Sequence, residues 1–442
     1  MERILFSPLG DTDPVRGCYD GAMLHILRHY HPARVVLFYT KDMAEKEHRD
    51  HRYTRAIHRT APDCVIEEIF TDIQEAHLYE SFSQLLPQAV LRLRSEHQEA
   101  QILLNLSSGT PQMKTVLAML AADMDGCVGI QVAAPARRSN RTNEATQDAE
   151  DVAALLENNF DEEEGAKNRC DAPPLGIFRY YAERSRIQSL IDSYEYAAAL
   201  KIARRSPLVP RAAVTLLAHA EKRCALRTEE AKDILREHEG RKLFPLSGRA
   251  ESLVEYFLIM QMDQETGRLS NLMLRMIPFL YEFLRDYVEQ NVLPLRELSE
   301  RRGGVPYLVR DKLAARAPAL LAHLDAEFPR GYSEQPLSFY ILHHVCAYAE
   351  ERGSARDAAL HTELMAELTK ITRVRELRNS VAHEMTNVTE ELFRAKMGIG
   401  SQETLSAFAR MLVLVCGDKV RPLRSLYRDI NAWTEKALEV HA

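Results

Sequence analysis

The chain has 442 residues, 46% of them hydrophobic, and a formal net charge of −7 at pH 7. This is enough apolar sequence for two or three domains with their own cores, and the acidic balance excludes a surface that is basic throughout and binds nucleic acid by charge alone. The sequence contains no run of about 18 apolar residues that would predict a membrane span. It also does not begin with the basic-then-apolar pattern of a signal peptide, so we expect a cytoplasmic protein.

Residues 1–135 alternate short β-rich runs with amphipathic helical stretches. The β-rich runs are RILFSPLG, ARVVLFYT, CVIEEIF, QILLNLSSG and CVGIQVAA. This alternation predicts an α/β domain, placed over residues 1–145, with a parallel, doubly wound sheet. Ligands of such sheets bind beyond the carboxyl ends of the strands, so the loops that follow the strands are the candidate site.

The fourth run, QILLNLSSG, leads directly into the helical stretch TPQMKTVLAML. Gly109 permits a tight turn, Thr110 is a preferred N-cap residue, and Pro111 falls at the first helical position. Free backbone N–H groups at such a helix start favour a phosphate or another anionic group. A plain helix cap and a nucleotide-type ligand site explain this stretch equally well.

The loop after the first run, PLGDTDPVRG, is expected at the same edge of the sheet. It offers Gly10, Asp11, Thr12 and Asp13. Two carboxylates would repel a phosphate, so we expect them to contact ribose hydroxyls or base edges, or to cap the first helix. No G-x-G-x-x-G fingerprint follows the first strand and no G-K-[ST] follows the fourth, which disfavours dinucleotide cofactors and P-loop chemistry.

After about residue 136 the sequence becomes polar and acidic, up to Pro173-Pro174. This composition predicts a linker or excursion over residues 146–174. Helical spacing then replaces strand signals, so the C-terminal two thirds is expected to be all-α. Breakers at Gly240–Pro245 and RRGGVP divide it, and we place a middle helical domain at residues 175–245 and a second helical domain at residues 246–442.

A long apolar stripe marks one stretch of the second helical domain. Its members, spaced by three and four residues, are Leu364, Leu368, Ile371, Val374, Leu377, Val381 and Met385. The spacing predicts one helix of at least about six turns, by the ~3.6-residue period, with the stripe facing the core. At about 100° per residue, Arg375, Asn379 and His383 form a row opposite the stripe, with Arg378 on its flank.

Arginine, asparagine and histidine can cleave RNA without a metal, because the RNA supplies its own 2′-hydroxyl as nucleophile. A histidine, with an unperturbed pKa of about 6.5, can serve as general base or acid, and a guanidinium can stabilise the charge on the phosphoryl oxygens. Two proton transfers require two histidines, which two chains across a two-fold axis would supply, so this interpretation predicts a homodimer. The alternative is a solvated polar helix face, the usual meaning of so short a pattern.

Three stretches in this order, GDTDP (10–14), NLSSGTPQMK (105–114) and RNSVAH (378–383), resemble the ancillary ribonucleases of type III CRISPR systems that form the Csm6 family. Members of that family join a Rossmann-like CARF sensor domain to a HEPN nuclease domain. The stretch from residue 168 to 203 resembles the family's connection into its middle helical domain. The resemblance therefore implies a CARF domain over residues 1–145 and a HEPN domain over residues 246–442.

The resemblance also implies a signalling enzyme. A synthase in the type III effector complex makes cyclic oligoadenylate, the CARF dimer binds it, and the HEPN dimer then degrades single-stranded RNA, with no cofactor, no metal and no stable binding to the effector complex. The implied catalytic residues are Arg378, Asn379 and His383. The implied activator pocket contains Gly10, Asp11, Thr12, Asp13, Asn105, Ser107, Ser108, Gly109, Thr110 and Gln112.

Two finer features follow from the same resemblance. The SSGTPQ form is similar to members that use cyclic hexaadenylate, with cyclic tetraadenylate as the alternative. In some relatives the sensor domain also degrades its activator slowly, and Thr110 is the candidate residue for such a ring-nuclease activity here.

The main alternative is a non-catalytic regulator, in which a CARF-type domain controls a helical module that binds DNA or protein. The acidic balance and the lack of a basic recognition helix count against DNA binding. A nicotinamide-dependent oxidoreductase is disfavoured because this sequence lacks the glycine fingerprint of dinucleotide binding. The seven widely spaced cysteines predict neither disulfides nor a metal site.

Overall fold

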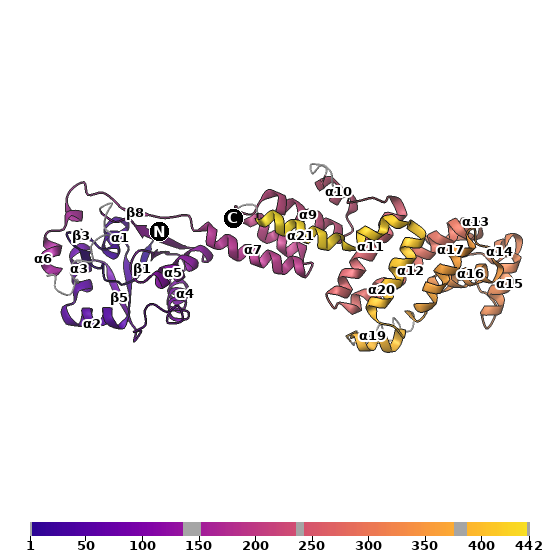
Figure 1. Ribbon diagram of the computed structural model, residues 1–442, viewed down its shortest axis with the longest axis horizontal. Coiled ribbons are helices and arrows are strands. Elements are labelled where there is room, and N and C mark those ends of the chain that lie inside the picture. Colours follow the sequence, from indigo (N-terminus) through magenta and orange to yellow (C-terminus); the bar gives the residue numbers. More distant parts are fainter. Residues whose placement is uncertain (1, 136–151, 236–242, 375–386, 440–442) are drawn as a thin grey trace. The chain divides into compact units, whose positions relative to one another are not determined.

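The computed structural model describes residues 2–135, 152–235, 243–374 and 387–439. They fall into two compact units, Met1–Ser185 and Arg186–Ala442, whose boundary lies within helix α7 (Gly176–Asp192). Figure 1 shows a first unit of mixed strands and helices and a second unit that is largely helical. The predicted fold class, a parallel α/β sheet followed by a mostly helical remainder, is confirmed.

A six-stranded sheet forms the centre of the first unit. Its strands in spatial order are β5 (Val65–Phe70), β4 (Arg34–Tyr39), β1 (Arg3–Pro8), β6 (Gln101–Asn105), β7 (Cys127–Val132) and β8 (Cys170–Asp171). The first five are parallel and are the five β-rich runs of the sequence, while β8 pairs antiparallel with β7. The chain order reverses at β1, so the loops after β1 and β6 meet at the switch point where α/β sheets bind ligands.

Helices cover both faces of this sheet. One face is covered by α1 (Ala22–Tyr30), α2 (Lys41–Asp50), α3 (Arg52–Thr60) and α6 (Val152–Glu157), and the other by α4 (Leu85–Glu96) and α5 (Pro111–Asp123). Each face of the sheet has its own hydrophobic core. Along β1, Leu5 belongs to the core beside α1, and Ile4 and Phe6 belong to the core beside α4 and α5. This alternation arises because successive side chains of a strand point to opposite faces.

Part of the stretch whose composition predicts a linker packs into the first unit. It includes α6, the short 3₁₀ helix η2 (Phe160–Glu162) and β8. The backbone N–H of Ala133 donates to the Arg169 carbonyl (2.9 Å), and the N–H of Asp20, in the hairpin of β2 (Val15–Arg16) and β3 (Tyr19–Asp20), donates to the Asp161 carboxylate (2.8 Å). The polar residues of this stretch are thus used in tertiary contacts.

The second unit is built from helices with one small exception. Its helices are α8 (Tyr196–Arg205), α9 (Arg211–Cys224), α10 (Thr228–Leu235), α11 (Gly248–Glu265), α12 (Leu269–Asn291), α13 (Leu295–Leu298), α14 (Arg310–Arg316), α15 (Pro318–Glu327), α16 (Phe339–Arg352), α17 (Ala358–Lys370), α19 (Glu390–Met397), α20 (Ser401–Cys416), η3 (Asp418–Ser425) and α21 (Leu426–Glu439). The all-α expectation is wrong for RRGGVP, which forms the turn of an antiparallel hairpin, β9 (Ser299–Arg302) and β10 (Val305–Leu308). Gly303 and Gly304 adopt φ of 58° and 86°, as such tight turns require. No helix in the described part of the chain is long and apolar enough to cross a membrane.

The C-terminal helix α21 returns to the start of the second unit, beside α9 (Figure 1). The Asn431 side chain donates to the Ile191 carbonyl (2.8 Å) and accepts from the Tyr196 hydroxyl (2.7 Å). The predicted middle and second helical domains therefore share one compact unit, and the border placed near residue 246 remains a prediction.

Candidate functional site

Two glycine-containing loops touch at the switch point of the sheet. A Cβ on Gly10 would lie 2.7 Å from the Gly109 nitrogen, which is closer than real Cβ contacts come. Gly109 adopts φ of 80°, and a Cβ there would lie 2.6 Å from Met113 Sδ. The close backbone approach therefore explains Gly10, whereas its positive φ and the Met113 side chain explain Gly109. The approach places the loop after β1 directly against the start of α5.

The start of α5 has the predicted geometry. Thr110 is the N-cap residue, Pro111 is the first helical residue, and the Thr110 hydroxyl accepts a long hydrogen bond from the Met113 N–H (3.5 Å). Gly109, Thr110 and Gln112 are half-buried. The predicted helix cap is confirmed, and the cap residue remains accessible to a ligand.

Asp13 is buried and holds its loop on the first helix. The residue is 1% exposed, and its carboxylate accepts from the N–H of Met23, near the start of α1 (3.2 Å), and from the N–H of Gly10 (3.1 Å). Desolvation raises the pKa of Asp13 to about 6, although hydrogen bonds from Ser108 and from these two backbone groups act in the opposite direction. Of the roles expected for the two acidic residues, Asp13 takes that of capping the first helix.

Asp11 has a different environment from Asp13. Its side chain is 79% exposed and pairs with Lys46 Nζ of α2 at 2.8 Å, and its neighbour Thr12 is half-buried. A second lysine, Lys114, lies one turn into α5, half-buried, where desolvation lowers its pKa and the charge of Asp13 raises it. The sequence pattern does not single out Lys114, although this residue stands at the end of the stretch NLSSGTPQMK. Its proximity to Asp13 in the fold adds positive charge to this site.

Asn105 organises the loop after β6. Its side-chain oxygen accepts from the N–H groups of Ser107 (2.9 Å) and Ser108 (3.2 Å), and its amide nitrogen donates to the hydroxyls of Ser7 (2.9 Å) and Ser108 (2.8 Å). The Ser107 hydroxyl accepts from the N–H of Val132 at the end of β7 (2.8 Å). These three predicted site residues are thus engaged in shaping the loop, whereas Gly109, Thr110 and Gln112 are its accessible part.

The predicted catalytic residues Arg378, Asn379 and His383 lie outside the described residues, as does Arg375. Of the apolar stripe that leads to them, Leu364, Leu368, Ile371 and Val374 are fully buried, which confirms that this part of the stripe faces the core. The members Leu377, Val381 and Met385 also lie outside the described residues.

The prediction of one continuous helix along this stripe is wrong. Helix α17 ends at Lys370, and turn residues 371–373 follow. The N–H groups of Ile371 and Val374 donate to carbonyls three residues back (3.0 and 3.2 Å), and the Thr372 hydroxyl donates to the Thr369 carbonyl (3.2 Å). β-Branched residues have low helix propensity and threonine hydroxyls compete for backbone carbonyls, so the stretch from Thr369 to Val374 favours a turn.

Both flanks of the RNSVAH stretch are tied to neighbouring helices. On the N-terminal side, Glu367 of α17 accepts two hydrogen bonds from the Arg410 guanidinium of α20 (2.8 and 2.9 Å) and one from Lys370 Nζ (2.8 Å). On the C-terminal side, the Val388 N–H donates to the Ser270 hydroxyl at the start of α12 (3.3 Å). These contacts attach the described residues before the stretch to α20 and those after it to α12.

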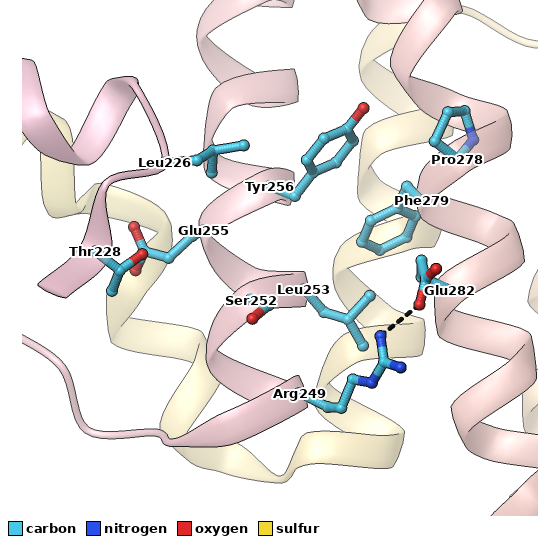
Figure 2. Close-up of a pocket in the computed structure, with 10 residues that line it drawn as sticks. All are labelled: Leu226, Thr228, Arg249, Ser252, Leu253, Glu255, Tyr256, Pro278, Phe279 and Glu282. Atoms are coloured by element: carbon cyan, nitrogen blue, oxygen red, sulfur yellow. Dashed lines mark hydrogen bonds and ion pairs between the residues drawn. The ribbon is translucent and has the colours of Figure 1, made fainter. Parts of the chain in front are cut away.

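The second unit also contains a small pocket between α10, α11 and α12 (Figure 2). Its volume is about 240 Å³, and it is lined by Leu226, Thr228, Arg249, Ser252, Leu253, Glu255, Tyr256, Pro278, Phe279 and Glu282. An ion pair joins Arg249 to Glu282, and Pro278 lies inside α12, where it cannot donate a helical hydrogen bond. The pocket contains none of the predicted site residues.

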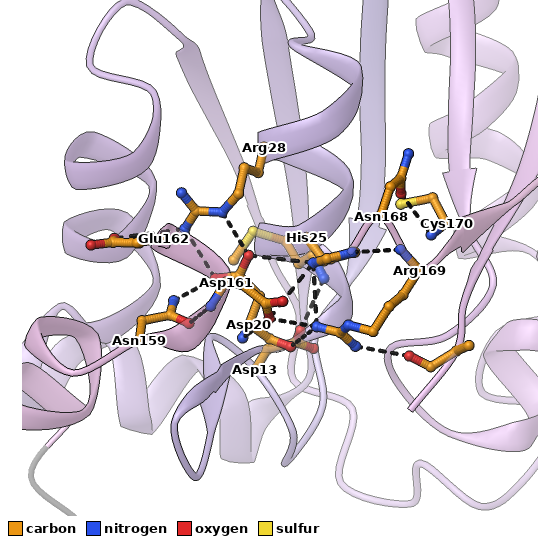
Figure 3. A network of polar contacts seen from close by, with 12 residues as sticks. Asp13, Asp20, His25, Arg28, Asn159, Asp161, Glu162, Asn168, Arg169 and Cys170 are labelled. Carbon is orange, nitrogen blue, oxygen red and sulfur yellow. Dashed lines mark hydrogen bonds and ion pairs between the residues drawn. The ribbon is translucent and has the colours of Figure 1, made fainter. Parts of the chain in front are cut away.

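One group among the described residues has ligand atoms close enough for a metal ion. These atoms, from Asp20, His25 and Asp161, lie within 4.8 Å of one another. The Arg169 guanidinium already lies among them, with Nη2 2.6 Å from Asp161 Oδ2 and 3.2 Å from His25 Nδ1 (Figure 3). Arginine therefore supplies the positive charge that a metal would bring.

A sensor-type α/β unit followed by a helical nuclease-type region is the architecture of CARF–HEPN proteins, and comparisons with known proteins identify this class. The model of the Csm6 CARF domain matches residues 63–170, that of the Csm6 6H domain residues 173–224, and that of the Csm6 HEPN domain residues 240–434. The three matches follow one another along the chain. The chain belongs to the Csm6 family of CRISPR endoribonucleases.

Similar proteins include three named CRISPR system endoribonuclease Csm6. The Enterococcus italicus protein is 26% identical over 424 residues (93% of this chain and 94% of that protein), and one from Streptococcus thermophilus is 25% identical over 430 residues (94% of each). The Mycobacterium tuberculosis protein is 37% identical over 207 residues, which are 46% of this chain and 50% of that protein. The solved structure of Enterococcus italicus Csm6 bound to cyclic hexa-2′-fluoro-hexa-dAMP shares the fold, with a TM-score of 0.68 at 24% identity over 98% of this chain and 100% of that one.

Proposed function

We propose that this protein is an endoribonuclease for single-stranded RNA that cyclic oligoadenylate activates during type III CRISPR defence. The observation that carries the proposal is the contact of the Gly10 and Gly109 backbones at the switch point, beside the accessible start of α5. Such a site suits a ligand with phosphates and planar bases, because helix N-termini favour anions and a bare backbone permits close approach. The diffusible activator links the enzyme to the effector complex in the cytoplasm without stable binding between them.

The activator contacts are proposed to come from the accessible part of the two loops. Gly109, Thr110 and Gln112 offer backbone and side-chain groups at the start of α5, and Lys114 adds a cation beside them. Gly10, Asp11 and Thr12 offer the facing wall. Asp13, Asn105, Ser107 and Ser108 shape the loops from within. Cyclic hexaadenylate is the preferred ring size, with cyclic tetraadenylate second; the bound ring named for the Enterococcus italicus structure supports six nucleotides.

The nuclease site is proposed to contain Arg378, Asn379 and His383 from each of two chains. The histidines transfer protons to and from the 2′-hydroxyl and the leaving oxygen, and the arginines stabilise the phosphoryl oxygens, so that no metal is required. A homodimer is supported by the first unit, where the apolar side chain of Met119 in α5 is 56% exposed. Contact with a second chain would bury this side chain.

The test is cleavage of a fluorescent single-stranded RNA by purified protein in EDTA, with no activator, with cyclic tetraadenylate or with cyclic hexaadenylate. We expect strong stimulation by the hexamer and weak or no stimulation by the tetramer. An inactive His383→Ala protein controls for a contaminating nuclease. If neither ring stimulates cleavage, the non-catalytic regulator becomes the better description.

A second experiment addresses the proposed ring-nuclease role of Thr110. The wild-type protein is incubated with cyclic hexaadenylate before RNA is added, and its activity should decline as the ring is opened. Thr110→Ala should prolong activation, while Thr110→Ser keeps a hydroxyl N-cap and should resemble the wild type. Identical decline in all three proteins would remove Thr110 from this role.

A further inference from the structure

A buried polar cluster joins the first helix to the stretch that leads out of the first unit. It consists of Asp20, His25, Arg28, Asn159, Asp161 and Arg169 (Figure 3). Asp20 accepts from Arg28 Nε (2.8 Å) and from the Asn159 amide (2.6 Å), while its own N–H donates to Asp161 (2.8 Å). The cluster therefore connects β3, α1, η2 and the segment before β8.

Arg169 is the member of this cluster with contacts to the largest number of elements. Its guanidinium donates to the Asp161 carboxylate of η2 (2.6 Å), to the Asp20 carbonyl of β3 (3.3 Å) and to the Ala133 carbonyl after β7 (2.8 Å). Its backbone N–H donates to His25 Nε2 of α1 (3.0 Å). The side chain is 9% exposed, so these contacts are largely shielded from water.

The charges of the cluster are strongly coupled. Burial alone would raise the pKa of Asp20, but hydrogen bonds from His25 and Arg28 outweigh it and bring this pKa down to about 2. Because His25 Nε2 accepts from a backbone N–H, the neutral imidazole carries its proton on Nδ1, which faces Asp20 Oδ2 at 3.5 Å. Separating one charged partner from the others leaves a buried charge without compensation, which costs stability. We therefore expect the residues of the cluster to move together.

The start of α1 connects this cluster to loop 10–14 of the candidate activator site. Asp13 holds the N–H of Met23 in the first turn of α1, and the Pro14 carbonyl accepts from the N–H of Gly21 (2.7 Å). A Cβ on Gly21 would lie 2.8 Å from both the Asp13 carboxylate and the Pro14 carbonyl, so the loop and the helix start cannot shift independently. A displacement of loop 10–14 must therefore displace α1 and β3, which carry His25 and Asp20.

On its other side the cluster leads to helix α7. Arg169 immediately precedes β8, and its carbonyl accepts from the Ala133 N–H (2.9 Å). After β8, Leu175 packs against the sheet, where its Cδ1 would lie 2.9 Å from a Cβ on Gly129, and α7 then begins at Gly176. The described chain therefore runs from Arg169 through one short edge strand into the helix at which the first unit ends.

We propose that Arg169 is a positioning residue that couples occupation of the activator loop to β8 and α7, and thereby to activation of the nuclease. This inference rests on the proposed function. Binding at loop 10–14 moves the Asp20 main chain and the His25 imidazole. Arg169 holds the first through its guanidinium and the second through its backbone N–H, and so transmits the change to the edge of the sheet. A network with two arrangements that the ligand distinguishes is what such coupling requires.

The experiment compares the full-length wild type with Arg169→Lys and Asp161→Asn. Lysine keeps a positive charge near Asp161, but one ammonium cannot reach the Ala133, Asp20 and Asp161 oxygens together. We measure the Kd for cyclic hexaadenylate by calorimetry and the RNA cleavage rate at saturating activator. Site-to-site coupling commonly corresponds to about 5–150-fold effects, so we expect roughly tenfold lower stimulation in both variants, with Kd and unstimulated cleavage nearly unchanged.

Hydrogen exchange provides a readout that does not depend on nuclease activity. In the wild type, cyclic hexaadenylate should change the exchange of the peptide that contains β8 and the start of α7; in Arg169→Lys this change should be lost while that of the loop 10–14 peptide remains. The control is Arg92→Lys, whose exposed ion pair with Glu67 lies elsewhere in the same unit. Circular dichroism and thermal unfolding establish that the variants are folded.

Each outcome has one meaning. A wild-type exchange response at β8 that persists in both variants, or full stimulation of RNA cleavage in them, overturns the coupling role of Arg169. A Kd that rises in step with the loss of stimulation also overturns it, because Arg169 would then merely support the pocket. If the wild type binds the ring but cleaves no RNA, the proposed function fails, and the exchange experiment still decides the coupling. If it does not bind, both proposals fail.

Discussion

Replacement of Asp13 by asparagine should change how the stability of the first unit depends on pH. A carboxyl with a pKa of about 6 in the folded chain, against 3.8 as its ordinary value, holds its proton more tightly when the chain is folded. Its ionisation therefore lowers stability: this cost is absent below about pH 3.8 and complete above about pH 6. An asparagine side chain cannot ionise, so the variant does not lose stability in this pH range through this position.

The magnitude follows from the size of the pKa difference. Between the two pKa values the free energy of unfolding of the wild type falls by about 1.4 kcal/mol per pH unit through this group. From about pH 4.5 to about pH 7.5, the variant should thus gain about 2 kcal/mol relative to the wild type. Asparagine has one acceptor oxygen, so either the Gly10 or the Met23 N–H loses its partner, at a cost of about 1–3 kcal/mol that does not depend on pH.

The assay is urea unfolding of the full chain, followed by pulsed hydrogen exchange of peptides from β1 and β6. This readout is needed because the single tryptophan, Trp433, lies in the second unit. Asp11→Asn is the matched control, since that carboxylate is 79% exposed and requires little desolvation on folding. A stability difference between Asp13→Asn and wild type that is flat with pH, or that favours the wild type more at high pH, would refute the reasoning.

Three further predictions concern the nuclease, the loop contact and the helical unit. His383→Ala should abolish RNA cleavage and leave the Kd for cyclic hexaadenylate unchanged by calorimetry; equal loss of both would show that the residue is structural. Gly10→Ala should weaken that binding by about tenfold or more and destabilise the first unit by about 1–3 kcal/mol, because the new methyl group overlaps the facing backbone; unchanged affinity would contradict a ligand site there. Arg223→Ala should destabilise the second unit by about 3–5 kcal/mol in urea unfolding followed by Trp433 fluorescence, since it leaves the buried Glu255 carboxylate unpaired. Arg223→Met with Glu255→Leu should recover most of that loss, and a double variant as unstable as the single one would contradict this account.

The buried pair behind the last prediction also explains why the helical part is one unit. Arg223 of α9 donates to both oxygens of Glu255 of α11 and to the Leu243 carbonyl (2.9 Å), and its guanidinium lies 4.0 Å from the centre of the Phe244 ring. The Arg223–Glu255 pair crosses the border that the breakers near residue 246 predict. Pro and Gly residues mark where a helix ends, but a domain border also requires that few contacts cross it.

The local features of the chain could be predicted because their causes are local. The five parallel strands coincide with short apolar runs between turn residues, and α5 starts at Pro111 after Thr110 because the cap uses residues adjacent in the chain. The acidic linker was the less accurate expectation. Its polar residues suggest solvent exposure, but they form hydrogen bonds with residues far away in the sequence. Arg169, for example, donates to His25, 144 positions away.

Sequence alone therefore determined the fold class, the order of the domains and the two loops of the candidate sensor site. Tertiary structure decided what the residues of those loops do. Asp11 and Asp13 are two positions apart and chemically identical, yet one is exposed beside Lys46 and the other is buried under α1 with a raised pKa. Desolvation and hydrogen-bond partners come from elements brought together by folding, and those two effects set the chemistry of a carboxylate.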